Sequence, residues 1–287
     1  MFAVAGVTGH TGSAAARALL ERSRPVRVIV RRREQGEPWA AQGAEVAVAS
    51  LDDATALATA LAGIEAAYLL LPPKYAEQDV LAAQARTADA IAEAVRTSGV
   101  GRVVFLSSQG ANRESGTGPV RALHYAEMQL TSTGVPVTML RAPYFLENWA
   151  GVFPMAREEG VLPTFIPVDR AIPTAVTGDI GRIAADALTR PHRGVRIVEI
   201  EGPERVSPRQ VAQALSAHLG RPVSPVEAPL DAVVPTFTAL GVSENAALLF
   251  REMYEAFNEG RMAPLGPPAE QARGTTPLGE GVALLLD

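Results

Sequence analysis

Cysteine is absent from this chain of 287 residues, and lysine occurs only once, at Lys74. Without cysteine the protein has no disulfide, no thiolate nucleophile and no cysteine-ligated metal. The four histidines are scattered along the sequence, without the paired spacing that metal ligands show. We therefore expect no metal site.

A positive net charge and a long apolar run are missing as well. The formal net charge is −5 and the pI is near 5.5, which argues against a nucleic-acid-binding surface. No apolar run approaches the ~20 residues that a membrane span needs, and the N-terminus lacks the basic region of a signal peptide. We expect a soluble, cytoplasmic protein with no nucleic-acid or membrane partner.

The first 33 residues contain an informative pattern. An apolar strand from Phe2 to Ala5 leads into Gly6-Val7-Thr8-Gly9-His10-Thr11-Gly12. A helix-forming run from Ser13 to Arg22 follows, and then a second strand from Val26 to Val30. Strand, glycine turn, helix and strand in this order are typical of the opening unit of a dinucleotide-binding domain.

Each glycine of this turn has a physical role. Gly6 permits the tight turn after the strand, Gly9 lets the backbone approach a pyrophosphate, and Gly12 lets the helix lie close to the sheet. The free N–H groups at the start of the helix then bind the phosphates. The same string also occurs in ordinary glycine-rich turns, so the prediction depends on the flanking strand and helix. We assign six turn residues to cofactor binding: Gly6, Thr8, Gly9, His10, Thr11 and Gly12.

Three arginines, Arg31 to Arg33, end the second strand, where an NAD site usually has Asp or Glu. A carboxylate repels the 2′-phosphate of NADP(H), whereas a guanidinium forms charge-assisted hydrogen bonds with it. We therefore expect NADP(H) as the cofactor, with Arg31 as the first ligand of the 2′-phosphate and Arg32 as a candidate second. The alternative is a solvated basic turn, because Glu34 and Glu37 follow closely.

Strands and helices continue to alternate after the arginines. Periodicity predicts strands at 44–49, 66–71, 102–106 and 136–141, and helices at 52–61, 79–98 and 121–133. This alternation predicts a doubly wound parallel sheet with right-handed crossovers, the Rossmann arrangement. Ligands of such sheets bind outside the carboxyl ends of the strands. Five further residues are expected there as part of the cofactor site: Pro72, Lys74, Ser107, Gln109 and Tyr144.

Within this set, Ser107 and Gln109 are expected to line the nicotinamide end. Tyr144 and Asn148 are expected to shape the pocket, although Asn148 could equally hold backbone groups of the neighbouring lobe. Lys74 could reach the cofactor, or it could remain a solvated loop lysine.

The pattern loosens after Tyr144, where proline and glycine become more frequent. We expect a short edge strand at 172–176, a strand at 195–201, helices at 180–189, 207–219 and 245–258, and a loop from Gly260 onward. The resulting prediction is an α/β fold with an NADP-binding Rossmann domain at 1–150 and a smaller α+β substrate lobe at 151–287. Some strands of the lobe, at about 173–200, could join or flank the larger sheet.

Four segments together resemble the NmrA-like group of atypical short-chain dehydrogenases, which includes NADPH:quinone reductase-like and azoreductase-like proteins. They are the glycine turn at 6–12, Gly134 to Arg141 with Phe145-Leu146-Glu147-Asn148, Thr177 to Arg182, and Glu201 to Glu204 with the turn Leu219 to Pro222. The resemblance spans most of the chain to about residue 225. It is specific for the family and not for one reaction, because the family holds reductases, redox sensors and biosynthetic enzymes.

The chain departs from ordinary short-chain dehydrogenases in its catalytic residues. Their Tyr-x-x-x-Lys pair uses an ammonium to lower the pKa of the tyrosine. That pair cannot exist on the helix at 121–133, because Lys74 is the only lysine; Leu123 occupies the position where some relatives keep a lysine. His124-Tyr125-Ala126-Glu127 resembles a His-x-x-Thr-Glu-like string of the quinone reductase-like members, apart from Ala126.

The resemblance implies that His124 and Tyr125 face the crevice, where one of them could supply a proton. His124 has the more convenient pKa, although it could simply cap or pack the helix. Glu127 could orient a neighbouring side chain or remain a solvated helix charge, and we favour the second.

These observations favour an NADPH-dependent oxidoreductase that transfers hydride to a small conjugated acceptor, such as a quinone, enone or imine. Two alternatives stay open: a redox sensor that binds NADP(H) and a protein partner without turnover, and a biosynthetic enzyme with non-redox chemistry. The long alanine-rich helices could also pair subunits into a homo-oligomer.

Overall fold

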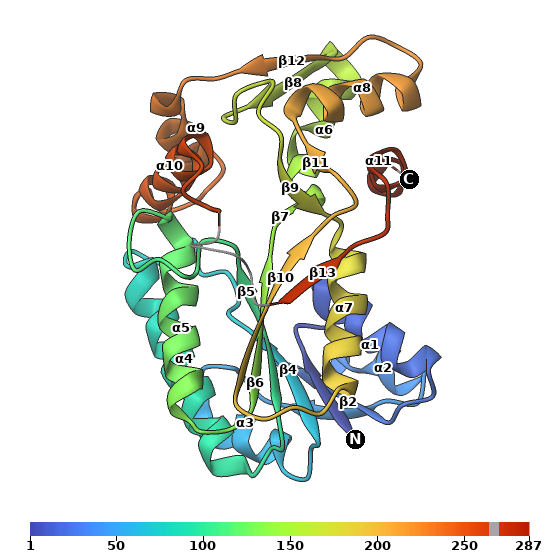
Figure 1. Ribbon diagram of the computed structural model, residues 1–287, viewed down its shortest axis with the longest axis vertical. Helices are drawn as coiled ribbons and strands as arrows, with labels where there is room; N and C mark the ends of the chain where they lie inside the picture. The colour runs from blue at the N-terminus through green and yellow to red at the C-terminus, as the bar shows by residue number, and fades with distance from the viewer. Residues whose placement is uncertain (264–269, 287) are drawn as a thin grey trace.

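An eight-stranded sheet, parallel throughout, forms the centre of the computed structural model, which describes residues 1–263 and 270–286 (Figure 1). Its strand order is β13-β10-β6-β5-β4-β1-β2-β3. The strands are β1 (Phe2–Ala5), β2 (Val26–Val30), β3 (Glu45–Val48), β4 (Ala66–Leu70), β5 (Val103–Ser108), β6 (Val137–Ala142), β10 (Val195–Glu201) and β13 (Glu270–Arg273). The order 3-2-1-4-5-6 within it is the one expected of a Rossmann sheet, and the predicted fold class is confirmed.

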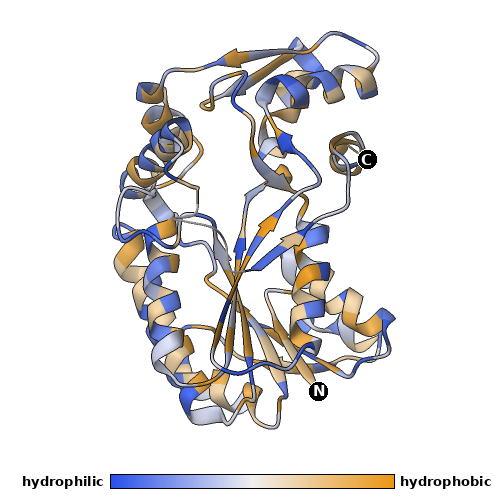
Figure 2. Ribbon diagram, viewed as in Figure 1, coloured by the Kyte–Doolittle hydropathy of each residue, from blue (hydrophilic) through white to orange (hydrophobic). Residues whose placement is uncertain are grey.

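Helices cover both faces of this sheet. On one face lie α1 (His10–Glu21), α2 (Glu37–Ala40) and α7 (Thr177–Thr189), and on the other lie α3 (Ala54–Leu61), α4 (Val80–Ser98) and α5 (Arg121–Ser132) (Figure 1). Short 3₁₀ turns, η1 (Arg33–Gln35) and η2 (Gly118–Val120), precede α2 and α5. The strands are orange along the middle of the sheet in Figure 2, because parallel strands buried on both faces are apolar on both.

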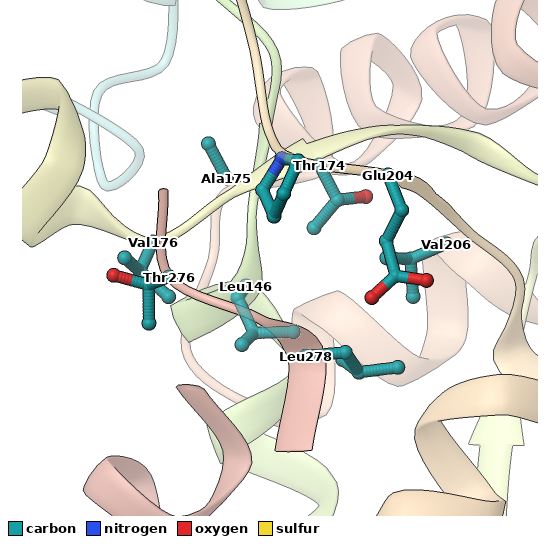
Figure 3. A pocket seen from close by; sticks show the side chains of 9 residues that line it. Leu146, Thr174, Ala175, Val176, Glu204, Val206, Thr276 and Leu278 are labelled. Atoms are coloured by element: carbon teal, nitrogen blue, oxygen red, sulfur yellow. The ribbon is translucent and has the colours of Figure 1, made fainter. Parts of the chain in front are cut away.

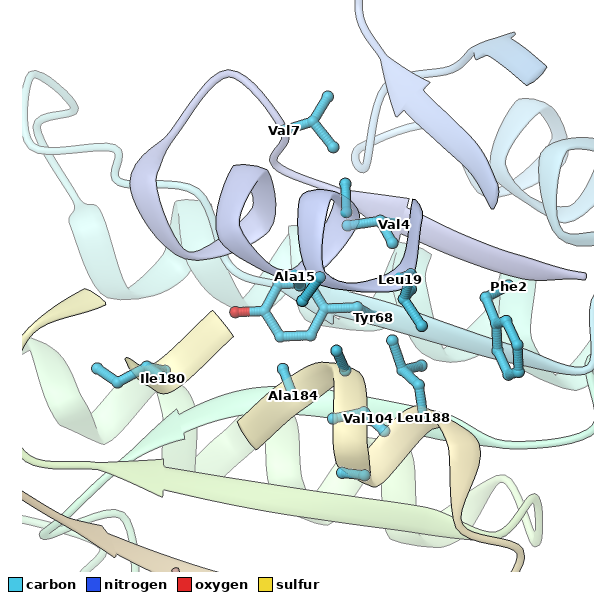
Figure 4. Close-up of a cluster of buried hydrophobic side chains, with 14 of the residues drawn as sticks. Phe2, Val4, Val7, Ala15, Leu19, Tyr68, Val104, Ile180, Ala184 and Leu188 are labelled. Carbon is cyan, nitrogen blue, oxygen red and sulfur yellow. The ribbon is translucent and has the colours of Figure 1, made fainter. Parts of the chain in front are cut away.

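The core on the α1–α7 face is centred on Tyr68 of β4 (Figure 4). The Tyr68 ring is fully buried beside Ala15 and Leu19 of α1, and Ala184 of α7 lies across from it. Burial raises the pKa of the Tyr68 hydroxyl well above its usual range. A second apolar cluster lies under α3, α4 and α5, so the sheet is covered on both sides.

Small residues allow α1 and α7 to touch. A Cβ on Gly181 of α7 would lie 2.3 Å from the Ala14 Cβ and 2.8 Å from the Thr11 carbonyl oxygen. Both distances are shorter than any carbon side chain tolerates, so this crossing requires glycine. The close approach of α7 fixes the position of the first turn of α1.

The remaining elements lie beyond the carboxyl edge of the large sheet (Figure 1). They form two small sheets, β11-β9-β7 and β12-β8, with several helices packed around a third apolar cluster. The strands are β7 (Tyr144–Phe145), β8 (Val161–Thr164), β9 (Ile172–Ala175), β11 (Arg205–Val206) and β12 (Ser224–Glu227). The helices are η3 (Leu146–Val152), α6 (Phe153–Glu159), α8 (Pro208–Leu219), η4 (Leu230–Ala232), α9 (Val233–Ala239), α10 (Glu244–Glu259) and α11 (Leu278–Leu286).

Two predictions for this half of the chain are wrong. β9, expected as an edge strand, is the middle strand of its sheet, between β7 and β11. The stretch from Gly260 onward, expected as a loop, contains β13 and α11, while 264–269 lie outside the described residues. β13 pairs with β10, Val198 opposite Glu270, so the chain end extends the large sheet. The division at residue 150 stays a prediction.

Candidate functional site

The glycine turn joins β1 to α1 as the sequence predicts. Gly6 has φ +70°, and a Cβ there would lie 2.6 Å from Leu70 Cδ2, so the turn needs glycine on both grounds. The Gly9 N–H donates to the Gly6 carbonyl at 2.9 Å, which closes the turn. A Cβ on Gly9 would have only that carbonyl, at 3.5 Å, within 4 Å. The backbone is therefore open to a ligand at Gly9.

The first turn of α1 offers N–H groups to an anion. Gly9 is the N-cap, and no side chain among the described residues caps this helix. Thr8, Gly9 and His10 are exposed, whereas Thr11 and Gly12 are buried. A Cβ on Gly12 would lie 2.4 Å from the Gly6 carbonyl oxygen, so Gly12 lets the helix approach the turn. An uncapped helix start with an open backbone in front of it fits a dinucleotide pyrophosphate.

Charged side chains meet at the ends of β2 and β4. The Lys74 ammonium donates to Asp52 Oδ1 at 2.8 Å, and the Thr87 hydroxyl donates to the same oxygen at 2.5 Å. Burial raises the pKa of the Asp52 carboxyl, but the two hydrogen bonds and the positive charges of Lys74 and Arg31 outweigh it and lower the pKa. Arg31 and Lys74, distant in the sequence, therefore act on one carboxylate. Arg31 itself is exposed.

The other residues predicted around this end are less engaged. Arg32 is exposed, and its backbone N–H donates to Gln35 Oε1 at 3.1 Å. Pro72 follows β4, and its carbonyl accepts a hydrogen bond from Gln84 at 3.4 Å. Both lie at the carboxyl edge of the sheet, where the prediction places them.

A buried ionic network lies at the carboxyl ends of β5, β6 and β10. The Arg141 guanidinium donates to both carboxylate oxygens of Glu127, at 3.0 and 2.7 Å, and to Glu199 Oε1 at 3.4 Å. The Ser107 hydroxyl donates to Glu127 Oε1 at 2.5 Å. Glu127 is only 8% exposed, so the expectation of a solvated helix charge is wrong. The ion pair with Arg141 stabilises the buried Glu127 carboxylate, which would be strongly destabilising without a partner.

Glu199 is the third charged residue of this network, and only one of its two carboxylate oxygens accepts a hydrogen bond among the described residues. Its Oε2 atom is buried and has no hydrogen-bond partner among the described residues. Burial raises the pKa of Glu199, and the repulsion from Glu127 adds to this, while Arg141 opposes it. The pKa stays raised because burial outweighs the attraction of Arg141, which also pairs with Glu127. Glu199 was not predicted from the sequence; the available signal was a carboxylate inside a strand that is otherwise largely apolar.

Gln109 and Tyr144 lie beside this network. The Gln109 backbone N–H donates to the Ala142 carbonyl, and its side chain donates to the Ile200 carbonyl, both at 2.9 Å. These bonds tie the loop after β5 to β6 and β10. Tyr144 is buried at the start of β7, and Asn148 is exposed.

His124 and Tyr125 lie in the first half of α5. The His124 Nδ1 is 2.8 Å from the Ala111 carbonyl oxygen, in the loop that follows Gln109. The Tyr125 hydroxyl donates to Asp89 Oδ1 of α4 at 2.9 Å, and this bond raises the pKa of Tyr125. The structure thus brings His124 to the β5 loop and directs the Tyr125 hydroxyl toward α4. Their catalytic roles stay predictions.

A groove and a small cavity lie among the described residues. A groove of about 450 Å³ follows α4 and α5, lined by Leu81, Ala82, Ala85, Glu114, Arg121, Ala122, His124, Tyr125 and Met128. A cavity of about 10 Å³ lies among Leu146, Val176, Val206, Thr276 and Leu278, which surround it in Figure 3. That volume holds roughly one water molecule, so the cavity is no substrate pocket.

The chain matches the model of the NmrA-like family over residues 1–275. It belongs to that family. The resemblance inferred from four sequence segments is therefore confirmed. Among the described residues of this family member, no helix is long and apolar enough to cross a membrane.

Two curated relatives that match most of the chain are reductases by name. The chain is 28% identical to the NAD(P)H azoreductase of Xenophilus azovorans over 255 residues, which cover 88% of this chain and 86% of the relative. It is 27% identical to the (4-alkanoyl-5-oxo-2,5-dihydrofuran-3-yl)methyl phosphate reductase of Streptomyces griseus over 275 residues, covering 96% and 93%.

Solved structures show the same fold. The NADPH-dependent quinone oxidoreductase QOR2 of Escherichia coli, complexed with NADPH, superposes with a TM-score of 0.84 at 24% identity over 100% of both chains. The triphenylmethane reductase of Citrobacter sp., complexed with NADP(H), gives 0.82 at 21% identity over 99% of this chain and 100% of the other. At such identities the likeness establishes the fold.

Proposed function

We propose that this protein is an NADPH-dependent oxidoreductase that transfers hydride to a small conjugated acceptor, such as a quinone, enone or imine. The observation behind the proposal is the pairing of an uncapped α1 start, opened by Gly9, with the basic residues Arg31 and Lys74 around Asp52. Names of relatives support the reaction class, since those reported above are reductases, including an azoreductase and a quinone oxidoreductase.

In this proposal the two ends of the crevice have different tasks. The α1 N–H groups and the residues Thr8 to Thr11 bind the pyrophosphate, and Arg31 binds the 2′-phosphate with help from Lys74 and Arg32. Bound NADPH would supply the hydride. Ser107 and Gln109 form the wall of the nicotinamide end, where hydrogen bonds to Glu127 of α5 and to the Ile200 carbonyl of β10 keep them fixed.

The missing lysine determines which acceptors suit the site. Lys74 is bound to Asp52, so α5 has no ammonium to lower the pKa of a tyrosine. A conjugated acceptor needs weaker acid assistance than an isolated ketone. Of the two candidate proton donors, we favour His124. Its Nδ1–H donates to the Ala111 carbonyl, so Nε2 carries a transferable proton when the ring is an imidazolium, and that proton passes to the acceptor as the ring becomes neutral. Tyr125 is made a weaker acid by Asp89.

The direct test is steady-state oxidation of NADPH by the nucleotide-free protein with a panel of quinones, enones and imines. We expect multiple turnovers with at least one conjugated acceptor, and a loss of at least ~10-fold in kcat for His124→Gln if His124 donates the proton. Tight NADPH binding without turnover on any acceptor would instead support the redox-sensor alternative, which the missing Tyr-x-x-x-Lys pair favours. Activity of a nucleotide-stripped preparation would indicate non-redox chemistry.

A further inference from the structure

Aromatic residues are few in this chain, yet many of them gather in one place. The sequence has 8 Phe, 5 Tyr and 2 Trp. Eight of these 15 side chains form two groups of ring contacts, here together called the aromatic cluster. One group contains Tyr75, Phe165, Phe237, Phe250 and Tyr254, and the other contains Tyr144, Trp149 and Phe257. They come from segments as distant as the loop after β4 and helix α10. Such gathering suggests a shared task.

The contacts within the cluster have the geometry of stacked and edge-on rings. Phe237 of α9 stacks on Phe250 of α10, with centroids 4.6 Å apart and planes inclined by 22°. Tyr75 meets the same Phe250 edge-on at 4.8 Å. Phe165, between β8 and β9, lies 5.2 Å from Tyr254. Offset and edge-on arrangements at these distances are the favourable ones for aromatic pairs.

The cluster runs from a buried end to a partly open one. Tyr144, Trp149 and Phe257 are buried, and Tyr144 lies directly beyond β6, whose carboxyl end holds the Arg141 network. Tyr254, one of the other five rings, packs against the buried apolar cluster that contains Tyr144 and Phe257, which brings the two groups together. The five other rings, those of Tyr75, Phe165, Phe237, Phe250 and Tyr254, are each half-buried.

Three of the five half-buried rings are not explained by packing against the apolar cores. Phe165, Phe237 and Phe250 lie outside the buried apolar clusters of the described residues. Tyr75 directly follows Lys74, and its carbonyl accepts the Ser243 N–H at 2.9 Å, so this end is fastened to a loop of the cofactor crevice. Rings that are ordered yet incompletely covered offer surface to a flat apolar group.

We propose that the half-buried end of the aromatic cluster is a specificity subsite, which stacks the ring of an acceptor that lies remote from its reacting ring. The protein then prefers acceptors with two or more fused or linked rings over single-ring ones. This inference rests on the proposed function, because it assumes an acceptor bound near Tyr144. Phe237 and Phe250 are the principal specificity-determining residues, since their stacked pair is in the centre of the half-buried set.

The experiment compares 9,10-phenanthrenequinone with 1,4-benzoquinone as acceptors for NADPH oxidation. In the wild-type protein we expect the larger quinone to have the higher kcat/KM. Phe237→Leu and Phe250→Leu should each lower kcat/KM for phenanthrenequinone by about 10-fold, the scale of a lost stacking contact, and leave benzoquinone within about 2-fold. Phe153→Leu, which removes a buried ring of the same lobe outside the cluster, should leave the ratio of the two values unchanged.

An equal loss for both quinones in Phe237→Leu and Phe250→Leu, or no loss for either, would overturn the inference. If neither quinone is reduced by the wild-type protein, the subsite is tested by binding alone, while the proposed function is decided separately by the wider panel of acceptors. The probes are anthracene-2-sulfonate and benzenesulfonate, which share an anion and differ in ring number. Tighter binding of the anthracene probe, weakened about 10-fold by Phe237→Leu, supports the subsite; equal affinities contradict it.

Discussion

Charge is held in opposite ways at two places along the carboxyl edge of the sheet. At the ends of β2 and β4, Arg31 is exposed and Lys74 is half-buried; Lys74 pairs with Asp52, and the charges of both cations lower the pKa of that carboxyl. At the other place, Arg141 is buried against Glu127 and Glu199, and its donors are used within the protein. Exposed, incompletely neutralised cations are free to bind a ligand, whereas a buried and paired cation fixes the strands around it.

The largest effect is expected for Arg141→Leu. The variant leaves Glu127 and Glu199 buried without their common partner, which should lower the free energy of unfolding by roughly 3–5 kcal/mol. Denaturant titration monitored by circular dichroism measures it. The control is Arg22→Leu, whose ion pair with Asp186 is about half exposed; it should cost less than about 1 kcal/mol. Equal losses of unfolding free energy in the two variants would mean that the buried Arg141 network stabilises the protein no more than an exposed ion pair does.

Alanine substitutions at two glycines of the turn before α1 should have different effects: one should lower stability and the other should weaken NADPH binding. Gly12→Ala places a Cβ 2.4 Å from the Gly6 carbonyl oxygen, a backbone atom, and should lower the free energy of unfolding by roughly 1–3 kcal/mol. Gly9→Ala meets only one atom, at 3.5 Å, and should leave stability within about 0.5 kcal/mol while weakening NADPH binding. Thermal denaturation and calorimetric titration measure the two. An unstable Gly9→Ala variant would show that Gly9 serves the fold.

Arg31→Glu tests the adenosine end. The reversed charge should raise the Kd of NADPH at least ~10-fold, about 1.4 kcal/mol, and change the Kd of NADH little. Arg24→Glu makes the same change of charge before β2, at the opposite edge of the sheet, and should affect neither nucleotide. If Arg31→Glu weakened both nucleotides equally, Arg31 would not be a ligand of the 2′-phosphate.

The smallest effect concerns pH and Glu199. Because its pKa is raised in the folded protein, the carboxyl favours folding in its protonated form. That contribution is complete below the unfolded pKa, 4.5, and is lost as the pH rises through the folded value. The difference in unfolding free energy between wild type and Glu199→Gln should therefore shift in favour of the variant as the pH rises above 4.5. Urea titrations at several pH values measure it, and a constant difference would contradict the network as described.

The elements that could be predicted well are those whose ends are marked by residues next to them in the sequence. Helix α4, expected at 79–98, spans 80–98, because the Asp79 side chain caps its start and Gly99, with φ +72°, ends it. By contrast, β13 is a polar segment, Glu-Gln-Ala-Arg, which becomes a strand only by pairing with β10. Helix α9 was missed because it contains Pro235 near its start. Pairing between distant segments leaves no period in the sequence.

The site divides in the same way. The glycine turn and Arg31 could be predicted because their residue types and spacing reflect what a dinucleotide needs. Glu127 could not, because its burial depends on its ion pair with Arg141, which reaches helix α5 from strand β6 and also pairs with Glu199 of β10. The aromatic cluster is likewise assembled from distant segments.

The account depends most on the assignment of NADP(H) to the crevice, which calorimetric titration of the nucleotide-free protein with NADPH, NADP⁺, NADH and NAD⁺ tests directly. We predict that the two phosphorylated forms bind at least ~10-fold tighter than the other two, because only they carry the 2′-phosphate that we propose Arg31 and Lys74 bind. Equal affinities for all four, or no binding at all, would contradict the account.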